Sequence, residues 1–145
     1  MSIFTEHFFE HLDYTEEVPL FLDECCRVLQ PGGVIRVIVP DFERYLRAYS
    51  AHGWSEINAL RNMRDDNVDG YFGCKYHTKM EVLNVVARQG WEHKFAYDYD
   101  TLKYLLERHG FQGVVRQEFG KSLMSELAID LKERADESLY VEAVK

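Results

Sequence analysis

The chain has 145 residues, 46% hydrophobic and 29% charged, which is the balance of an ordinary soluble globular domain. Its formal net charge of −8 argues against nucleic acid and anionic membrane surfaces, which both require a basic face. No apolar run approaches the roughly 20 residues that span a bilayer, and no basic-then-apolar leader opens the sequence. We therefore expect a single domain over residues 1–145, located in the cytoplasm, with neither nucleic acid nor membrane as partner.

The first part of the chain predicts a strand, a helix and a second strand. Residues 2–5 are expected to end a strand. In residues 16–29 the apolar positions recur at helical spacing, so one face of this helix should pack inward. Residues 31–33 (PGG) stop the helix and reverse the chain. Residues 34–39 are β-branched and almost uniformly apolar, which is typical of a strand covered on both faces.

The rest of the chain continues this alternation and indicates an α/β fold. Residues 65–77 are rich in Asp, Gly and aromatic residues and predict a loop, whereas residues 120–138 mix acids and bases and predict a partly helical or mobile connection. Apolar periodicity and capping residues predict helices over residues 42–52, 55–64, 79–88 and 99–109, and strands over residues 114–119 and 139–144.

Several motifs resemble the second half of the class I S-adenosylmethionine-dependent methyltransferases. Residues 10–12 (EHL) resemble the loop after the family's fourth strand, and residues 27–33 (RVLQPGG) resemble the turn before its fifth. Residues 93–98 (HKFAYD), 110–111 (GF) and 137–143 (ESLYVEA) are similar to its last helix and its sixth and seventh strands. The resemblance implies a partial Rossmann-like sheet: the end of strand 4 and strands 5, 7 and 6, with strand 7 antiparallel between its neighbours.

The sequence contains no glycine-rich nucleotide turn of the G-x-G-x-G kind. Gly32 and Gly33 lie between a helix and the following strand, which is the reverse of the order in such a turn. In the family this turn follows the first strand, and an acidic residue that holds the cofactor ribose ends the second, so both would lie upstream of Met1. The resemblance therefore implies S-adenosylmethionine as the cofactor, bound weakly or not at all by this chain alone.

The resemblance implies methyl transfer to an acceptor that the sequence does not identify, by direct displacement at the sulfonium methyl. Such a reaction needs alignment of the acceptor more than a strong acid or base. The chain is then the C-terminal portion of the enzyme and is not competent alone. The alternative is a non-catalytic methyltransferase-like remnant that serves as an interaction or structural module. An in-frame glycine-rich strand, turn and helix upstream of the start codon would favour the enzyme.

The resemblance also names candidate site residues. Glu10 and His11 follow the carboxyl end of the fourth strand, where ligands bind in open parallel sheets, and are the expected residual cofactor contacts. An insertion over residues 52–97 is expected to cover the acceptor pocket. Structural hydrogen bonds, or a core beneath a lid, are the alternative roles for such residues. The candidate catalytic residues are His11 and His93, and the candidate substrate-binding residues are Tyr71, Tyr76, His77 and His93.

Residues 7–11 (HFFEH) match the H-x-x-E-H pattern of inverted zinc proteases. On a helix, His7 and His11 would share a face and bind zinc, with Glu10 as the base. The pattern leads instead into the helix and strand that resemble a methyltransferase, so we expect no metal site. The 3 cysteines lack zinc-site spacing and cannot all pair, so we expect reduced, structural thiols.

The expected partners are a second copy of the chain or a separately encoded N-terminal half, besides a small-molecule acceptor. Without the family's first three strands and most of its fourth, an edge and both faces near the strand over residues 34–39 are left uncovered and open to pairing. The apolar residues Ile3, Phe4, Phe8 and Phe9 are then uncovered, and a second copy would cover them by symmetric packing or by exchange of the N-terminal segment. The alternative is a monomer in which local helices fold back over the edge.

Overall fold

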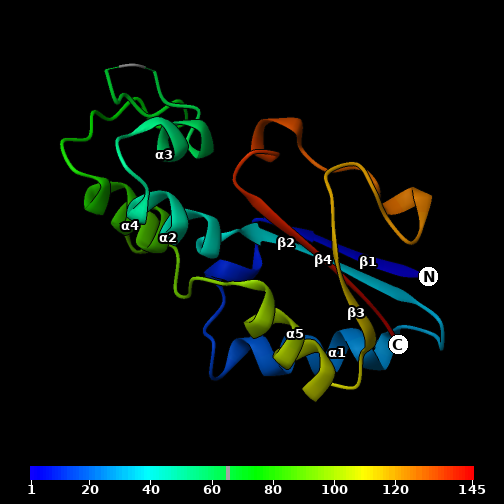
Figure 1. The fold of residues 1–145 in the computed structure, drawn as a ribbon. Coiled ribbons are helices and arrows are strands. Elements are labelled where there is room, and N and C mark those ends of the chain that lie inside the picture. Colours follow the sequence, from blue (N-terminus) through cyan, green and yellow to red (C-terminus); the bar gives the residue numbers. More distant parts are fainter. Residues whose placement is uncertain (65) are drawn as a thin grey trace.

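The structure is a computed structural model that describes residues 1–64 and 66–145. Among these residues, strands form one four-stranded sheet in the order β1-β2-β4-β3 (Figure 1). The strands are β1 (Ser2–Glu6), β2 (Val34–Pro40), β3 (Gln112–Gln117) and β4 (Ser138–Val144). The α-helices are α1 (Glu17–Val28), α2 (Phe42–Ser50), α3 (Ser55–Leu60), α4 (Lys79–Arg88) and α5 (Tyr99–Arg108).

The sheet combines one parallel and two antiparallel strand pairs. β1 runs parallel to β2, with Ser2 opposite Val34. β2 pairs antiparallel with β4 over its whole length, so that Val34 also lies opposite Val144. β3 is outermost and antiparallel to β4, with a register shift between Gln112 and Val115. The last strand of the chain therefore lies antiparallel between β2 and β3, which confirms the strand order expected from the sequence.

The turn before β2 has a conformation that requires glycine. Gly32 adopts a φ of +81°, a left-handed conformation that other residues rarely take. Its N–H donates to the carbonyl of Lys145 at 2.9 Å. A Cβ on Gly33 would lie 2.9 Å from the backbone oxygens of Gln30 and Met1. The two glycines thus allow α1 to end tightly against the strands that flank β2.

One face of the sheet is apolar and is covered by α1 and α5 (Figure 1). α1 buries Val18, Leu22 and Cys25, whose spacing puts them on one side of the helix. They pack with leucines of α5 and with the inward-facing residues of β2 and β4, which are Ile35, Val37, Val39, Leu139, Val141 and Ala143. All 7 residues of β2 are buried, so the expectation of a strand covered on both faces is confirmed.

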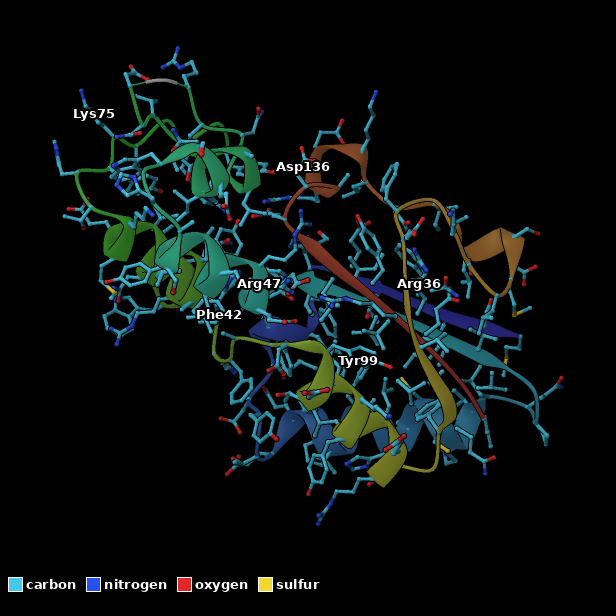
Figure 2. The ribbon with its side chains drawn as sticks, in the orientation of Figure 1. Arg36, Phe42, Arg47, Lys75, Tyr99 and Asp136 are labelled. Carbon is cyan, nitrogen blue, oxygen red and sulfur yellow. The ribbon has the colours of Figure 1, made fainter. Side chains whose placement is uncertain are left out.

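The opposite face of the sheet carries a buried ionic group. Arg36 (Figure 2), in the middle of β2, is fully buried and donates two hydrogen bonds to the carboxylate of Asp130, at 2.9 and 2.6 Å. A further hydrogen bond, of 2.8 Å, joins Arg36 to Glu142 of β4. These bonds hold the connection between β3 and β4 over the sheet. As predicted, this connection is partly helical, with 3-10 helices η3 (Ser125–Leu127) and η4 (Lys132–Arg134).

Beyond the carboxyl ends of β1 and β2, the helices α2, α3 and α4 form a separate layer (Figure 1). α4 continues into a 3-10 turn, η2 (Gln89–Trp91). These elements pack around their own core, which contains Tyr45, Ala48, Ile57, Leu60, Tyr76, Val82, Leu83 and Val86. None of the described helices is both long and apolar enough to cross a membrane.

The ends of these helices follow from local chemistry. The carboxylate of Asp41 accepts a hydrogen bond from the N–H of Arg44 and caps α2, which lies within the helix predicted over residues 42–52. The helix predicted over residues 55–64 ends earlier, at Leu60, because Asn62 takes a left-handed conformation with a φ of 49°. Asp65, the first residue of the predicted loop, lies outside the described residues.

Candidate functional site

The parallel strands β1 and β2 both have their carboxyl ends at the end of the sheet that faces the insertion, residues 52–97. His7 follows β1 directly, adopts a φ of 48°, and donates its N–H to the carbonyl of Ile38 at 2.9 Å. This left-handed residue turns the chain away from the sheet and into a 3-10 turn, η1 (Phe9–His11). Because Phe9 is buried in the apolar core, it anchors η1 and fixes the positions of Glu10 and His11.

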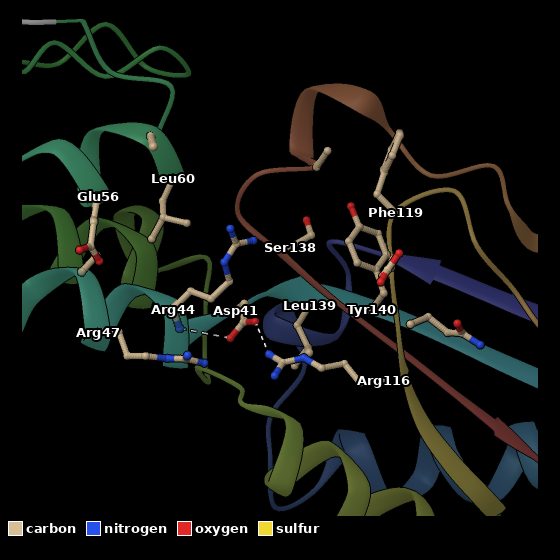
Figure 3. Close-up of a pocket in the computed structure, with 15 residues that line it drawn as sticks. Asp41, Arg44, Arg47, Glu56, Leu60, Arg116, Phe119, Ser138, Leu139 and Tyr140 are labelled. Atoms are coloured by element: carbon tan, nitrogen blue, oxygen red, sulfur yellow. Dashed lines mark hydrogen bonds and ion pairs between the residues drawn. The ribbon is translucent and has the colours of Figure 1, made fainter.

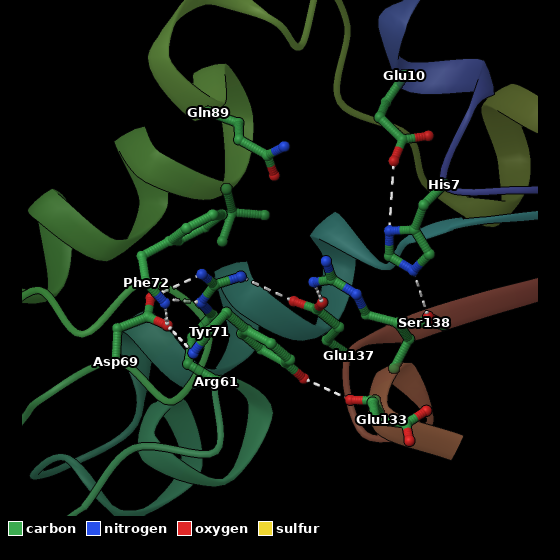
Figure 4. Close-up of polar contacts among 12 residues, drawn as sticks. His7, Glu10, Arg61, Asp69, Tyr71, Phe72, Gln89, Glu133, Glu137 and Ser138 are labelled. Carbon is green, nitrogen blue, oxygen red and sulfur yellow. Dashed lines mark hydrogen bonds and ion pairs between the residues drawn. The ribbon is translucent and has the colours of Figure 1, made fainter. Parts of the chain in front are cut away.

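Glu10 is a buried carboxylate without hydrogen-bond partners. The residue is 1% exposed, and neither side-chain oxygen has a partner among the residues that the structure describes. His7 Nδ1 lies 3.3 Å and His93 Nε2 3.9 Å from the same Glu10 oxygen (Figure 4 shows His7 and Glu10). The backbone carbonyl of Glu10, in contrast, accepts hydrogen bonds from the N–H groups of Lys94 and Phe95, at 2.7 and 3.3 Å. These backbone bonds bring His93 to Glu10.

The imidazoles of His11 and His93 are held by backbone carbonyls. His93 Nδ1 donates to the carbonyl of Val86 at 2.7 Å, and His11 Nδ1 donates to that of Glu92 at 3.1 Å. A carbonyl oxygen only accepts, so in both rings Nδ1 carries the hydrogen and Nε2 is the free atom. The ring centroids lie 4.8 Å apart, edge to face. Burial lowers the pKa of His93 below its usual value, so its imidazole is neutral near pH 7.

Glu10, His11 and His93, here called the Glu10 cluster, thus offer one carboxylate and two imidazoles to a common point. The structure brings together three residues that the sequence singled out, although their cofactor and catalytic roles stay predictions. The H-x-x-E-H pattern does not form the single helix of a zinc protease, since η1 begins at Phe9 and His7 lies before it with a positive φ. A cluster of this composition can accept a proton or bind a cation.

A pocket of about 640 Å³ lies at the same end of the sheet, between the strand ends, α2 and α3 (Figure 3). Asp41 Oδ2 accepts a hydrogen bond from Arg116 of β3 at 2.5 Å, so this carboxylate is paired. Arg44 has no carboxylate within ion-pair distance among the described residues, and its side chain extends into the pocket (Figure 3). Ser138 also lines the pocket, and its Oγ lies 2.9 Å from His7 Nε2, which connects the pocket to the Glu10 cluster.

The predicted substrate-binding tyrosines surround a second buried ionic group and do not line this pocket. Arg61 donates hydrogen bonds to Asp69 at 3.0 and 2.6 Å and to Glu137 at 3.0 Å (Figure 4). The Tyr76 hydroxyl donates to Asp69 at 2.7 Å, and the Tyr71 ring lies 4.7 Å from the Arg61 guanidinium carbon. Burial raises the pKa of Tyr71 to about 12, so this hydroxyl stays neutral.

His77 is exposed just before α4, and its N–H donates to the Glu81 carboxylate at 2.6 Å as part of the helix start. These contacts of Tyr71, Tyr76 and His77 are those of a structural framework. Their role in substrate binding stays a prediction.

Three residues that line the pocket were missed in the sequence. Arg44 follows Asp41, whose carboxylate caps α2. Arg116 and Ser138 belong to β3 and β4, and they come near Asp41, just after β2, because the last strand lies inside the sheet between β2 and β3. Their approach to Asp41 depends on strand order, so no local spacing reveals it.

Comparison with known proteins gives a likeness to a solved structure. No protein-family model matches the chain, and no curated protein sequence matches it. Among solved structures, it is similar to the crystal structure of a SAM dependent methyltransferase from Archaeoglobus fulgidus, with 18% sequence identity and a TM-score of 0.52. The likeness covers 99% of this chain but 58% of the archaeal one, so the chain spans somewhat over half its length. It shows the fold, a partial Rossmann-like methyltransferase sheet, as the motifs implied.

Proposed function

We propose that this chain is the acceptor-binding, C-terminal portion of an S-adenosylmethionine-dependent methyltransferase. The observation that carries the proposal is the strand order β1-β2-β4-β3 with an antiparallel last strand, on a fold similar to the archaeal methyltransferase over 99% of the chain. Fold alone does not define function. The proposal is further supported by the position of the pocket and the Glu10 cluster, at the strand ends where open α/β sheets bind ligands.

The described residues do not form a complete site for S-adenosylmethionine. Rossmann-like folds bind such cofactors against a glycine-rich turn that follows a strand, because glycine permits close approach of the backbone. The chain leaves β1 through His7 and β2 through Asp41, so neither turn begins with glycine. We propose that further polypeptide supplies the glycine turn and the ribose-binding acid, and that Glu10 and His11 make residual contacts. When bound, the cofactor supplies an electrophilic methyl group.

The 640 Å³ pocket is the proposed acceptor site. The insertion contributes Glu56 and Leu60 of α3 to its lining. The arginines Arg44 and Arg47 also line it and favour an acceptor with a carboxylate or phosphate group, which guanidinium groups bind with paired hydrogen bonds. The main task of these residues is to hold the acceptor in line with the methyl group. A base contributes only when the acceptor is a hydroxyl or an ammonium group.

Calorimetric titration with S-adenosylmethionine tests this proposal in two preparations. The first is the 145-residue chain, and the second is the chain purified by a C-terminal tag from its own cells, with whatever polypeptide precedes or accompanies it. We expect weak or no binding by the first and micromolar binding by the second. Micromolar binding by the first would contradict the proposed need for further polypeptide.

Absence of binding in both preparations would favour the alternative, a non-catalytic interaction module. Transfer of a tritiated methyl group to the small molecules of a cell extract is the accompanying activity assay, run with the second preparation. Arg44→Met should reduce this transfer, because it removes the unpaired guanidinium from the pocket. Arg27→Met, on the exposed side of α1, is the matched control and should not reduce it.

A further inference from the structure

Glu10 presents an energetic problem that the described protein groups do not solve. A carboxylate that is 1% exposed has lost its water, and neither oxygen has a hydrogen-bond partner among the described residues. Leaving such a group unsatisfied is costly, whereas a bound cation or a paired donor offsets the cost. The small void that Glu10 lines with His93 leaves no room for a water molecule. The chemistry of the neighbouring imidazoles of His11 and His93 therefore indicates which kind of ligand can bind to the Glu10 carboxylate.

We propose that Glu10, His11 and His93 form a binding site for a divalent transition-metal ion. A carboxylate oxygen and two imidazole nitrogens of these residues all lie within 4.8 Å of one another. They come from two segments, η1 and the residues that follow η2. The hydrogen bonds that the Glu10 carbonyl accepts join these two segments. The site is thus held by backbone contacts and does not depend on side chains alone.

The two imidazoles are oriented as metal ligands usually are. Metal-binding histidines commonly donate one ring N–H to a backbone carbonyl, which fixes the ring and leaves the other nitrogen for the ion. His93 and His11 both do this, through Nδ1 to Val86 and Glu92 respectively. Their Nε2 lone pairs are left without another role among the contacts of the described residues. His11 is only partly buried, so it provides a route by which an ion can enter.

The ligand set selects the class of metal. Two histidines with one carboxylate suit zinc or another first-row transition ion, whereas magnesium and calcium prefer oxygen ligands. Zinc bonds of about 2.0–2.2 Å put neighbouring ligand atoms of a tetrahedral site about 3.3–3.6 Å apart. His93 Nε2 lies 3.9 Å from Glu10 Oε1, so this pair needs an approach of about 0.3–0.6 Å.

His7 is a positioning residue for this site. Its Nδ1 lies 3.3 Å from the same Glu10 oxygen, and its Nε2 lies 2.9 Å from Ser138 Oγ (Figure 4). It therefore lies beside the carboxylate and links the site to the pocket. This proposal does not depend on methyl transfer, and with a metal bound His11 and His93 act as ligands and not as bases.

Direct metal binding to the full chain tests the proposal. Thiolates also bind zinc, so the parent protein carries Cys25→Ala, Cys26→Ser and Cys74→Ser and is freed of metal with a chelator. Calorimetric titration should show one Zn²⁺ per chain, and Co²⁺ should give the visible absorption of a site with nitrogen and oxygen ligands. Magnesium at the same concentration should not bind.

Four variants of this parent locate the ion. Glu10→Gln, which keeps the shape of the side chain, and His93→Ala should each weaken Zn²⁺ binding by about 100-fold or more, because each removes a direct ligand. His7→Ala should weaken binding by roughly 10-fold, as expected for a positioning residue. His52→Ala, at an exposed histidine outside the cluster, should leave binding unchanged.

Magnetic resonance of the unsubstituted chain keeps the test decisive even if a variant fails to fold. Addition of Co²⁺ should shift or broaden the imidazole resonances of His11 and His93 before those of His52. The proposal is overturned if the parent binds none of Zn²⁺, Co²⁺, Ni²⁺ and Mn²⁺. It is equally overturned if binding survives Glu10→Gln and His93→Ala, or if Co²⁺ perturbs His52 first.

Discussion

Glu142, in strand β4, and Glu10, just beyond strand β1, are both buried glutamates, but their surroundings differ. Glu142 accepts hydrogen bonds from Arg36 at 2.8 Å, from the Leu123 N–H at 2.7 Å and from the Gln117 amide at 3.0 Å. Glu10 accepts none from its side-chain oxygens among the described residues. A buried charge that the protein itself satisfies belongs to the framework, whereas one that it leaves unsatisfied marks a place for a ligand. The predictions below test this distinction.

The largest loss in the free energy of unfolding should come from replacing Arg36, the buried cation of the sheet. Arg36→Met leaves the buried carboxylates of Asp130 and Glu142 without their shared partner, which typically costs about 3–5 kcal/mol. The control is Arg27→Met, which breaks an exposed pair with Glu24 that is typically worth about 0–1 kcal/mol. Urea unfolding of both variants gives the two free energies. Similar losses would show that the buried network does not hold the β3–β4 connection on the sheet.

A second framework effect should depend on pH. Burial would raise the pKa of Asp69, but hydrogen bonds from Arg61 and Tyr76 outweigh it, so the pKa lies below the ordinary value of 3.8. A pKa that is lower in the folded state contributes stability above the unfolded value, and this contribution is lost as pH falls through the folded value. The free energy of unfolding should therefore fall as the pH is lowered below about 4.

Asp69→Asn should remove part of this decline, because the amide does not titrate. Asp66→Asn is the control, since the exposed Asp66 lies 4.0 Å from Arg64 in a solvated pair. Urea unfolding of the three proteins between about pH 2 and pH 7 compares their slopes. If Asp69→Asn declines as steeply as the unsubstituted chain, the Asp69 ion pair is not a source of acid sensitivity.

Much of the framework was predictable from the sequence because it depends on local periodicity. The apolar spacing of residues 16–29 and the β-branched run at residues 34–39 predict α1 and β2 to within a residue or two. The ionic face was not predicted. Arg36 stands in an apolar run, and its partners Asp130 and Glu142 lie 94 and 106 positions away in the sequence. Only the tertiary fold brings them together.

The candidate site was predictable in part for a related reason. Glu10 and His11 were found because they follow a strand, and strand ends carry ligand sites in this type of sheet. A metal site at the Glu10 cluster was not expected, because the H-x-x-E-H pattern leads into a helix and strand that resemble a methyltransferase. In the structure His93, which the insertion brings from another part of the chain, and not His7, lies with Glu10 and His11.

A smaller effect, of opposite sign, is expected at Glu10. With a chelator present, Glu10→Gln removes an unsatisfied charge, so the free energy of unfolding should stay constant or rise by about 1 kcal/mol. Glu142→Gln, the matched change in the framework, should lower it by roughly 3 kcal/mol because it breaks the pair with Arg36. Urea unfolding of both variants measures the difference. Equal losses at the two positions would mean that Glu10 is satisfied after all and marks no ligand site.

The last prediction concerns assembly of the chain into a dimer, for which we expect the smallest effect on the free energy of unfolding. Among the described residues, β1 pairs only with β2, so its other edge is open to a second strand. Phe8, just beyond β1, is 43% exposed and has its ring centroid 5.5 Å from that of Phe21. We propose that the chain forms a homodimer through this edge. Phe9 lies in the apolar core, so its substitution would unfold the chain rather than dissociate a dimer.

Sedimentation equilibrium at micromolar concentration tests the dimer. Phe8→Asp should shift the mass to that of the monomer, because a carboxylate would be buried in the interface. Lys132→Asp, on the exposed side of the β3–β4 connection, should leave the dimer intact. A single species of monomer mass for the unsubstituted chain would refute the proposal. The dimer also offers an alternative partner for Glu10, supplied by the second copy. In that case the effect of Glu10→Gln on the free energy of unfolding would depend on protein concentration. The dependence would disappear when Glu10→Gln is combined with Phe8→Asp. The metal site predicts the same Glu10→Gln effect in both backgrounds.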